Sequence, residues 1–157
     1  MNNANSQFLQ IIDATPLVSI DLIIINADHQ ILLGKRNNRP ARNYWFVPGG
    51  SIKKNETLAA AVQRISKQEL GFIMDISDGR LLGAYDHIYE DNFAAHPGIN
   101  THYVALAYQF KLMFIPDLVP DQQHDAMHWF TRVALLAHPQ VHANTKAYFT
   151  SPERPVQ

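Results

Sequence analysis

Glu69 is the first candidate for chemistry, because it is a carboxylate on the apolar face of a predicted helix. The segment 56–70 has helical spacing of apolar residues, and Glu69 projects within about 20° of Leu58, in the middle of the apolar stripe. It also lies in the last turn, where the helix dipole disfavours a negative charge. A carboxylate at this position needs an arginine or a metal ion as its partner. The alternative is that the helix ends early and Glu69 lies in water.

A basic stretch precedes this helix. No acidic residue occurs between Asp28 and Glu56, whereas the same stretch contains Lys35, Arg36, Arg39, Arg42, Lys53 and Lys54. It also contains Gly49-Gly50, which leads to the start of the helix. Backbone N–H groups, a helix dipole and arginines together suit a phosphate or pyrophosphate. An ordinary solvated surface is the alternative.

Two further polar residues stand out from their surroundings. Asp21 lies within the apolar run 17–25, where an unpartnered carboxylate is costly, so it is expected to face a site or to pair with an arginine. His124 lies in the all-polar segment 121–125, which is expected to be a loop. A histidine there can act as a base near neutral pH. The alternative is an exposed histidine without a role.

The elements that must position these residues follow from apolar spacing and turn signals. Strands are expected over 17–25, 30–35, 81–89, 101–112 and 127–130, with a short apolar stretch at 45–47 that ends in a turn at 48–50. Helices are expected over 8–12, 56–70, 133–137 and 141–149, the second of them capped by Asn55 and ended by Gly71. Interleaved strands and helices indicate an α/β fold, in which helices cover a mixed sheet in three α/β/α layers.

Composition excludes several classes of protein. A length of 157 residues predicts one domain over 1–157. The 13 Lys and Arg against 14 Asp and Glu argue against a globally basic nucleic-acid binder. The absence of cysteine excludes disulfides, thiolate zinc sites and cysteine nucleophiles. With neither a signal peptide nor an apolar run long enough to span a membrane, we expect a soluble, cytoplasmic protein without nucleic-acid or membrane partners.

The segment 50–72 resembles the Nudix signature, G-x5-E-x7-R-E-U-x-E-E-x-G-U, in which U is aliphatic. The matching residues are Gly50, Glu56, Arg64, Glu69 and Gly71, with Phe72 at the last apolar position. Ile65 and Gln68 replace two signature glutamates, and Ser66 replaces the aliphatic residue between them. The resemblance implies a Nudix-type α/β/α sandwich with a mixed β-sheet and a Nudix-like box at 50–72.

Other segments resemble the GDP-mannose mannosyl hydrolase branch of the same family, which lacks the same two glutamates. They are 6–8, 14–19, 32–36, 44–50, 89–93, 101–103, 123–125 and 141–144. The resemblance implies hydrolysis of GDP-mannose, or of a related sugar nucleotide such as GDP-glucose, to GDP and free sugar. Water would attack the anomeric carbon with inversion, passing through an oxocarbenium-like state. A homodimer is implied as well.

The resemblance also assigns the metal site and the base. Mg²⁺, with Mn²⁺ as the alternative, would be held by the carbonyl of Gly49 and the side chains of Glu69 and Gln123. Oxygen ligands of this kind are those that Mg²⁺ prefers. His124 would be the general base for the attacking water, next to Gln123 in the chain.

The remaining roles concern the two ends of the substrate. The departing GDP would be stabilised by Arg36, Arg64 and Tyr103. The sugar would face Asp21 and His87. Phe8 would help to enclose the nucleotide, and the residues assigned to substrate binding are Phe8, Arg36 and Tyr89.

One position departs from this branch, and two other functions compete with it. Ser51 stands where the relatives usually carry an arginine, and neither Lys53 nor Lys54 offers bidentate geometry. We therefore hypothesise a slower or differently selective enzyme. The first competing function is a Nudix diphosphatase that cleaves a P–O bond of nucleotide sugars or nucleotides. The second is a nucleotide-sugar binder without catalysis.

Overall fold

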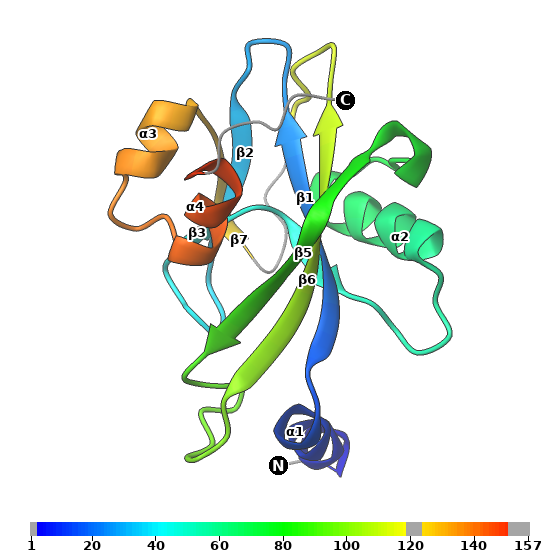
Figure 1. Ribbon diagram of the computed structural model, residues 1–157, viewed down its shortest axis with the longest axis vertical. Coiled ribbons are helices and arrows are strands. Elements are labelled where there is room, and N and C mark those ends of the chain that lie inside the picture. Colours follow the sequence, from blue (N-terminus) through cyan, green and yellow to red (C-terminus); the bar gives the residue numbers. More distant parts are fainter. Residues whose placement is uncertain (1–2, 119–123, 151–157) are drawn as a thin grey trace.

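The computed structural model describes residues 3–118 and 124–150, and in it a mixed sheet is covered by helices on both faces (Figure 1). The strands are β1 (Leu17–Ile25), β2 (Ile31–Arg36), β3 (Trp45–Phe46), β4 (Gly49–Ser51), β5 (Arg80–Tyr89), β6 (Thr101–Lys111) and β7 (His124–Phe130). The helices are α1 (Asn3–Ala14), α2 (Leu58–Leu70), the 3-10 helix η1 (Ile76–Asp78), α3 (Arg132–Ala137) and α4 (Ala143–Thr150). The predicted α/β class and the mixed sheet are confirmed.

The sheet divides where β1 and β2 separate. Its order is β3-β2-β1-β6-β5, and β1 pairs with β6 in parallel, whereas the other pairs are antiparallel. β1 and β2 pair at Ile25 and Ile31, next to their hairpin turn. Beyond that point β1 takes β4 as its partner and β2 takes β7. The two halves of the sheet therefore diverge, and the space between them opens at the level of Asp21.

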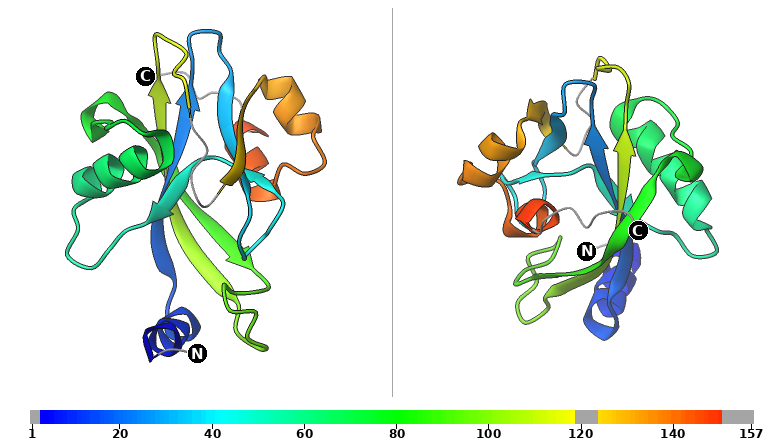
Figure 2. Two further views of the ribbon diagram at one scale, coloured as in Figure 1. Left: turned by 180° about the vertical axis from the view of Figure 1, so that it is seen from behind. Right: turned by 45° about the horizontal axis from the view of Figure 1, so that its top comes forward.

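The two faces of β1 belong to two hydrophobic cores, because alternate side chains of a strand point to opposite faces. Ile20, Leu22 and Ile24 pack with the apolar side of α2. Ile23 packs on the other face with residues of α3 and α4. Figure 2 shows these two helices on the side of the sheet opposite to α2. Asp21 shares the parity of Ile23, so its carboxylate lies on the α4 side of the sheet. None of the described helices is long and apolar enough to cross a membrane.

The start of α2 differs from the prediction. Thr57, not Asn55, caps the helix, and its Oγ1 accepts a hydrogen bond from Ala60 N at 3.2 Å. Asn55 instead takes a φ of 64° in the preceding turn. The predicted end is confirmed, since Gly71 is the C-cap with a φ of 82°, a left-handed conformation that glycine adopts without strain.

An ion pair fixes the turn before α2. Glu56 accepts hydrogen bonds from Arg64 Nε at 2.6 Å and Nη2 at 2.9 Å, and from the backbone N–H of Lys53 at 2.9 Å. Arg64 also donates from Nη2 to the carbonyl of Ser51 at 2.9 Å. The hydrogen bonds from Arg64 and Lys53 lower the pKa of Glu56 to about 2. This network joins the helix to the end of β4.

Other parts of the secondary structure also differ from the predictions. The expected turn at 48–50 is in part a strand, because Gly49 and Gly50 continue as β4. His124 is the first residue of β7 rather than part of a polar loop, and it pairs with Arg36. The last helix begins at Ala143, since Val141 forms a bridge with Trp45. η1 was not expected at all.

Replacement of Gly49 by alanine should disturb the pairing of β4 with β1. A Cβ at this position would lie 2.6 Å from the carbonyl oxygen of Ile20 and 2.6 Å from Asp21 Oδ1, so the strand must shift. We expect Gly49→Ala to lower the free energy of unfolding by about 1–3 kcal/mol, as measured by urea denaturation. Gly50→Ala is the matched control, because its Cβ would meet Ile65 side-chain atoms at 3.2 Å and these can move. Equal losses in the two variants would contradict the steric argument.

Removal of the Glu56 charge should have an effect on stability that depends on pH. The pKa of Glu56 is about 2 in the folded chain against an ordinary 4.5, so the pair stabilises the fold fully above pH 4.5 and progressively less as the pH falls toward 2. The difference in unfolding free energy between the wild type and Glu56→Gln should therefore shrink from pH 5 to pH 2. Glu90→Gln, which removes an exposed carboxylate outside the pair, is the control. A difference that stays constant with pH would refute this role of the pair.

Candidate active site

A cavity of about 230 Å³ opens where the two halves of the sheet diverge. Its walls come from β1, β2, the loop after β2, the β3–β4 segment, β5 and β6. The residues predicted for the site that line it are Asp21, Arg36, Gly49, His87, Tyr89 and Tyr103. These residues are spread over more than 80 positions of the sequence, and the sheet brings them together.

Asp21 is largely buried in the cavity wall. Its side chain is 16% exposed, and Oδ2 accepts a hydrogen bond from the hydroxyl of Tyr148 at 2.5 Å. Burial raises the pKa of Asp21 to about 6, although the Tyr148 hydrogen bond and the charge of Arg36 act in the opposite direction. The carboxylate thus faces the cavity and is held by a tyrosine rather than by an arginine ion pair.

His87 lies beside Asp21 on β5. Its ring is buried, with Nδ1 4.0 Å from Asp21 Oδ2 and Nε2 3.2 Å from the Tyr148 oxygen. Burial lowers the pKa of His87 to about 4, and the positive charges of His142 and Arg36 add to this effect, while Asp86 opposes it. The imidazole is therefore neutral at pH 7.

Arg36 brings a cation to the same cavity. Its guanidinium lies 4.1 Å from the centre of the Phe46 ring, and Nη1 donates to the carbonyl of Pro40 at 2.9 Å. The Phe46 ring also stacks on His142, with 4.7 Å between the ring centres. Burial lowers the pKa of His142, as does the charge of Arg36. Cation–π contact and a carbonyl acceptor hold the guanidinium where an anion in the cavity would meet it.

Arg39 is the second residue of the basic stretch that reaches the cavity. Its Nη1 lies 2.8 Å from Oδ2 of Asp91, in the loop between β5 and β6. The other four basic residues of that stretch do not line the cavity. Of the six basic residues predicted to form an anion site, Arg36 and Arg39 are therefore the two that line the cavity.

Oxygen groups for a metal ion lie between β4 and α2. Hydrogen bonds between β1 and β4 use alternate residues, so Gly49 and Ser51 direct their carbonyls away from β1. Arg64 donates to the Ser51 carbonyl, which shows that this edge of β4 faces α2. The Gly49 carbonyl lies on the same edge. Glu69 lies on the buried face of α2, one turn after Ile65. Ile65 is the residue whose side chain lies next to Gly50.

This donor set fits a hard divalent cation. A buried carboxylate and an outward backbone carbonyl are oxygen ligands of the kind that Mg²⁺ accepts, with further positions left to water and substrate. Within residues 3–118 and 124–150, no group of three or more His, Cys, Asp or Glu is placed to hold a metal. Gln123, the third predicted ligand, lies outside the described residues. The backbone of His124, the predicted base, lies next to Arg36 at the start of β7.

Besides Glu69 on α2, two predicted site residues with described side chains, Arg64 and Phe8, do not line the cavity. Arg64 is engaged with Glu56 and the Ser51 carbonyl, and it does not line the cavity wall. Phe8 lies on α1, where its ring packs against Phe93 with 5.2 Å between the ring centres and stays 39% exposed. Neither residue contacts the cavity in this chain, because each has a partner elsewhere.

Sequence reasoning missed Tyr148, Phe46 and His142 as parts of the site. Tyr148 stands 127 positions from its partner Asp21, and no local spacing connects the two. Phe46 and His142 are apolar or aromatic members of predicted elements, so they look like ordinary core residues. Only the resemblance of the segments 44–50 and 141–144 pointed toward them.

Comparisons with known proteins identify the family of this chain. The family model described as NUDIX domain matches residues 15–150. The low-salt glycan biosynthesis protein Agl8 of Haloferax volcanii is 39% identical over 132 residues, which cover 83% of this chain and 81% of Agl8. The ADP-ribose pyrophosphatase of Methanocaldococcus jannaschii is 41% identical over 70 residues, which are 45% of this chain and 40% of that protein.

A solved structure shows the same fold. The MutT protein from Methanosarcina mazei Go1 superposes with a TM-score of 0.71 and is 21% identical, covering 87% of this chain and 92% of its own. The match to the family model extends over most of the sequence. The Nudix-like box at 50–72 lies within the matched residues, on β4 and α2. The chain therefore belongs to the Nudix domain family.

Proposed function

We propose that this protein hydrolyses a GDP-sugar, GDP-mannose or a relative such as GDP-glucose, to GDP and free sugar by attack of water at the anomeric carbon with inversion. The observation that carries this proposal is that α2, the helix of the Nudix box, lacks two of the signature glutamates. Where the signature has two further glutamates, Ile65 is buried against Gly50 and Gln68 accepts a hydrogen bond from Arg64 at 3.2 Å. Glu69 alone remains of the three carboxylates, which does not favour a multi-metal attack on phosphorus.

The cavity has the polarity that such a substrate needs. Arg36 and Arg39 offer positive charge to a diphosphate, whose negative charge grows as it leaves. Asp21 and the neutral His87 lie together in the wall and can accept hydrogen bonds from sugar hydroxyl groups. Tyr103 lies across from His87 in the β5–β6 pair and also lines the cavity. Its hydroxyl is proposed to contact the leaving group.

A base and a divalent ion complete the proposal. His124 would remove a proton from the attacking water, and the pairing of its backbone with Arg36, a residue of the cavity wall, supports this role. Glu69, the carbonyl of Gly49 and Gln123 would hold Mg²⁺ or Mn²⁺. When bound, the ion supplies charge neutralisation to the departing diphosphate. Arg64 would then act indirectly, by joining α2 to β4 so that Glu69 and Gly49 keep their places.

The relatives support the class of substrate. Agl8 is a glycan biosynthesis protein by name, which accords with a nucleotide sugar. The ADP-ribose pyrophosphatase relative favours a second candidate, a diphosphatase that cleaves between the two phosphates.

We also propose a homodimer, since α1 exposes Phe8 and Ile11. Sedimentation as a monomer at all accessible concentrations would contradict it.

Product analysis tests the reaction directly. We expect ³¹P NMR to show GDP, and ¹H NMR to show free sugar of inverted anomeric configuration, after incubation with GDP-mannose and Mg²⁺. The diphosphatase would yield GMP and mannose 1-phosphate instead. A nucleotide-sugar binder without catalysis would protect the protein against thermal unfolding without forming any product.

Replacement of the proposed base should slow catalysis without abolishing binding. General-base catalysis contributes about 10²–10⁴-fold, so His124→Ala should lower kcat on GDP-mannose by that factor. His128, four residues along the same strand and solvent-exposed, is the matched control, and His128→Ala should retain wild-type kcat. Steady-state kinetics under saturating Mg²⁺ measures both variants. Unchanged turnover in His124→Ala would remove this residue from the mechanism.

A further inference from the structure

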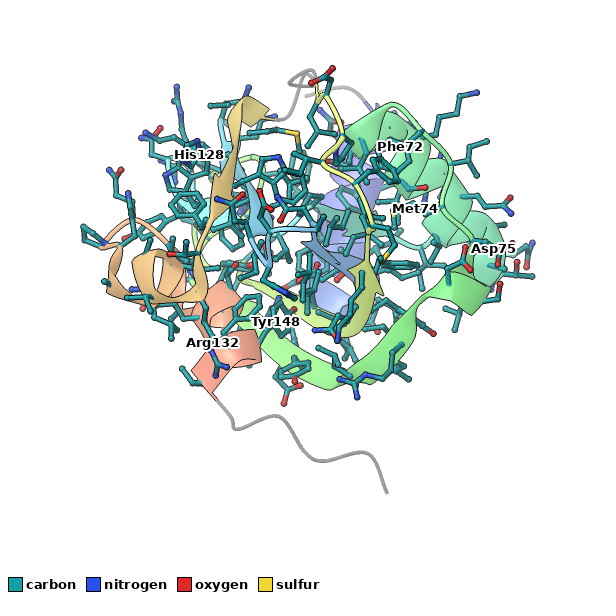
Figure 3. The ribbon with its side chains drawn as sticks, turned by 90° about the horizontal axis from the view of Figure 1, so that it is seen from above. Phe72, Met74, Asp75, His128, Arg132 and Tyr148 are labelled. Atoms are coloured by element: carbon teal, nitrogen blue, oxygen red, sulfur yellow. The ribbon has the colours of Figure 1, made fainter. Side chains whose placement is uncertain are left out.

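Tyr148 connects two residues of the cavity wall from behind. It lies on α4 (Figure 3). Its side chain is 8% exposed and packs edge-on against Tyr85, with 4.7 Å between the ring centres. It does not itself line the cavity. Its hydroxyl reaches Asp21 on β1 and His87 on β5, so three separate elements meet at one oxygen atom.

The two contacts of this hydroxyl require opposite roles. A tyrosine hydroxyl has one hydrogen to donate, and here it is donated to Oδ2 of Asp21. The contact of 3.2 Å with Nε2 of His87 is then a hydrogen bond only if the tyrosine oxygen accepts it. A hydrogen bond at this contact therefore requires the hydrogen on Nε2.

The other ring nitrogen is consistent with this assignment. Nδ1 of His87 lies 4.0 Å from Oδ2 of Asp21, which is too far for a hydrogen bond. A hydrogen on Nδ1 would thus form no hydrogen bond with the carboxylate. Burial and the nearby positive charges of His142 and Arg36 lower the pKa of His87, so the ring is neutral and only one nitrogen is protonated.

We propose that Tyr148 is a positioning residue, which holds the Asp21 carboxylate in place and fixes His87 as the Nε2–H tautomer with Nδ1 as an acceptor. Asp21 and His87 both line the cavity, and in this tautomer each side chain carries an acceptor atom. Such a pair attracts hydroxyl donors and repels phosphate oxygens. This role rests on the proposed function, because a sugar is the part of a GDP-sugar that offers hydroxyl groups to two neighbouring acceptors.

The tautomer of His87 affects the orientation in which the substrate binds in the cavity. Arg36 and Arg39 attract the diphosphate, whereas the acceptor pair attracts the sugar. If Nδ1 instead carried the hydrogen, this nitrogen would be a donor and His87 would no longer exclude phosphate. Tyr148 therefore contributes to the direction in which the substrate binds, without contact to it.

The tautomer can be measured without any substrate. Long-range ¹H–¹⁵N correlation spectra of the ¹⁵N-labelled full chain at pH 7 distinguish Nε2–H from Nδ1–H, and His87→Gln identifies the signals. We expect Nε2–H in the wild type and a loss of that preference in Tyr148→Phe, which keeps the ring and its packing. An Nδ1–H tautomer in the wild type, or an unchanged tautomer in Tyr148→Phe, would overturn the proposal.

Kinetics separates this role from a merely structural one. Loss of positioning should raise KM for the GDP-sugar roughly tenfold in Tyr148→Phe, the effect of about one hydrogen bond. The inhibition constant of GDP, which has no sugar, should stay unchanged. Tyr85→Phe removes a hydroxyl from the adjacent ring and should change neither value.

Equal weakening of GDP and GDP-sugar in Tyr148→Phe would contradict positioning at the sugar. If the wild type cleaves no GDP-sugar, the proposed function fails, and the tautomer measurement still decides the role of Tyr148.

Discussion

The site depends on the close approach of β4 to β1 at Gly49. A glycine is required there, because any Cβ would collide with the main chain of Ile20 and with the carboxylate of Asp21. The contact has two consequences. On one side Asp21 lies over Gly49 in the cavity wall, and on the other the Ser51 carbonyl at the edge of β4 accepts a hydrogen bond from α2, the helix that carries Glu69. One strand pairing thus joins the sugar end of the proposed site to the place of the proposed metal.

Much of the fold and part of the site could be predicted from local sequence. Leu17–Ile25 forms the predicted strand, and the periodicity of α2 places Glu69 on its buried face. Asp21 stood out because a carboxylate interrupts an apolar strand. These residues are recognisable since the conflict between their charge and their surroundings is visible within a few positions of the chain. Spacing alone predicted the layers, and the Nudix box predicted the family.

The remaining features depend on contacts between distant segments. Tyr148 belongs to a helix with no local anomaly, and its role arises only when α4 packs on the face of the sheet that carries Asp21 and His87. Arg64 matches the signature, yet its hydrogen bonds to Glu56 and β4 direct it away from the cavity. The cap at Thr57 was missed because the Glu56 network determines where the turn ends. In each case the local sequence allows more than one arrangement, and tertiary packing determines which one forms.

Hydrolysis of GDP-mannose in ¹⁸O-labelled water with Mg²⁺ tests the central claim most directly, because it identifies the atom that water attacks. Attack at the anomeric carbon predicts that the label appears in the free sugar while GDP stays unlabelled. That result would agree with a helix on which Glu69 is the single remaining carboxylate of three. Label in GDP, GMP or a sugar phosphate would mean attack at phosphorus, and it would contradict the proposed reaction while leaving the Nudix fold intact.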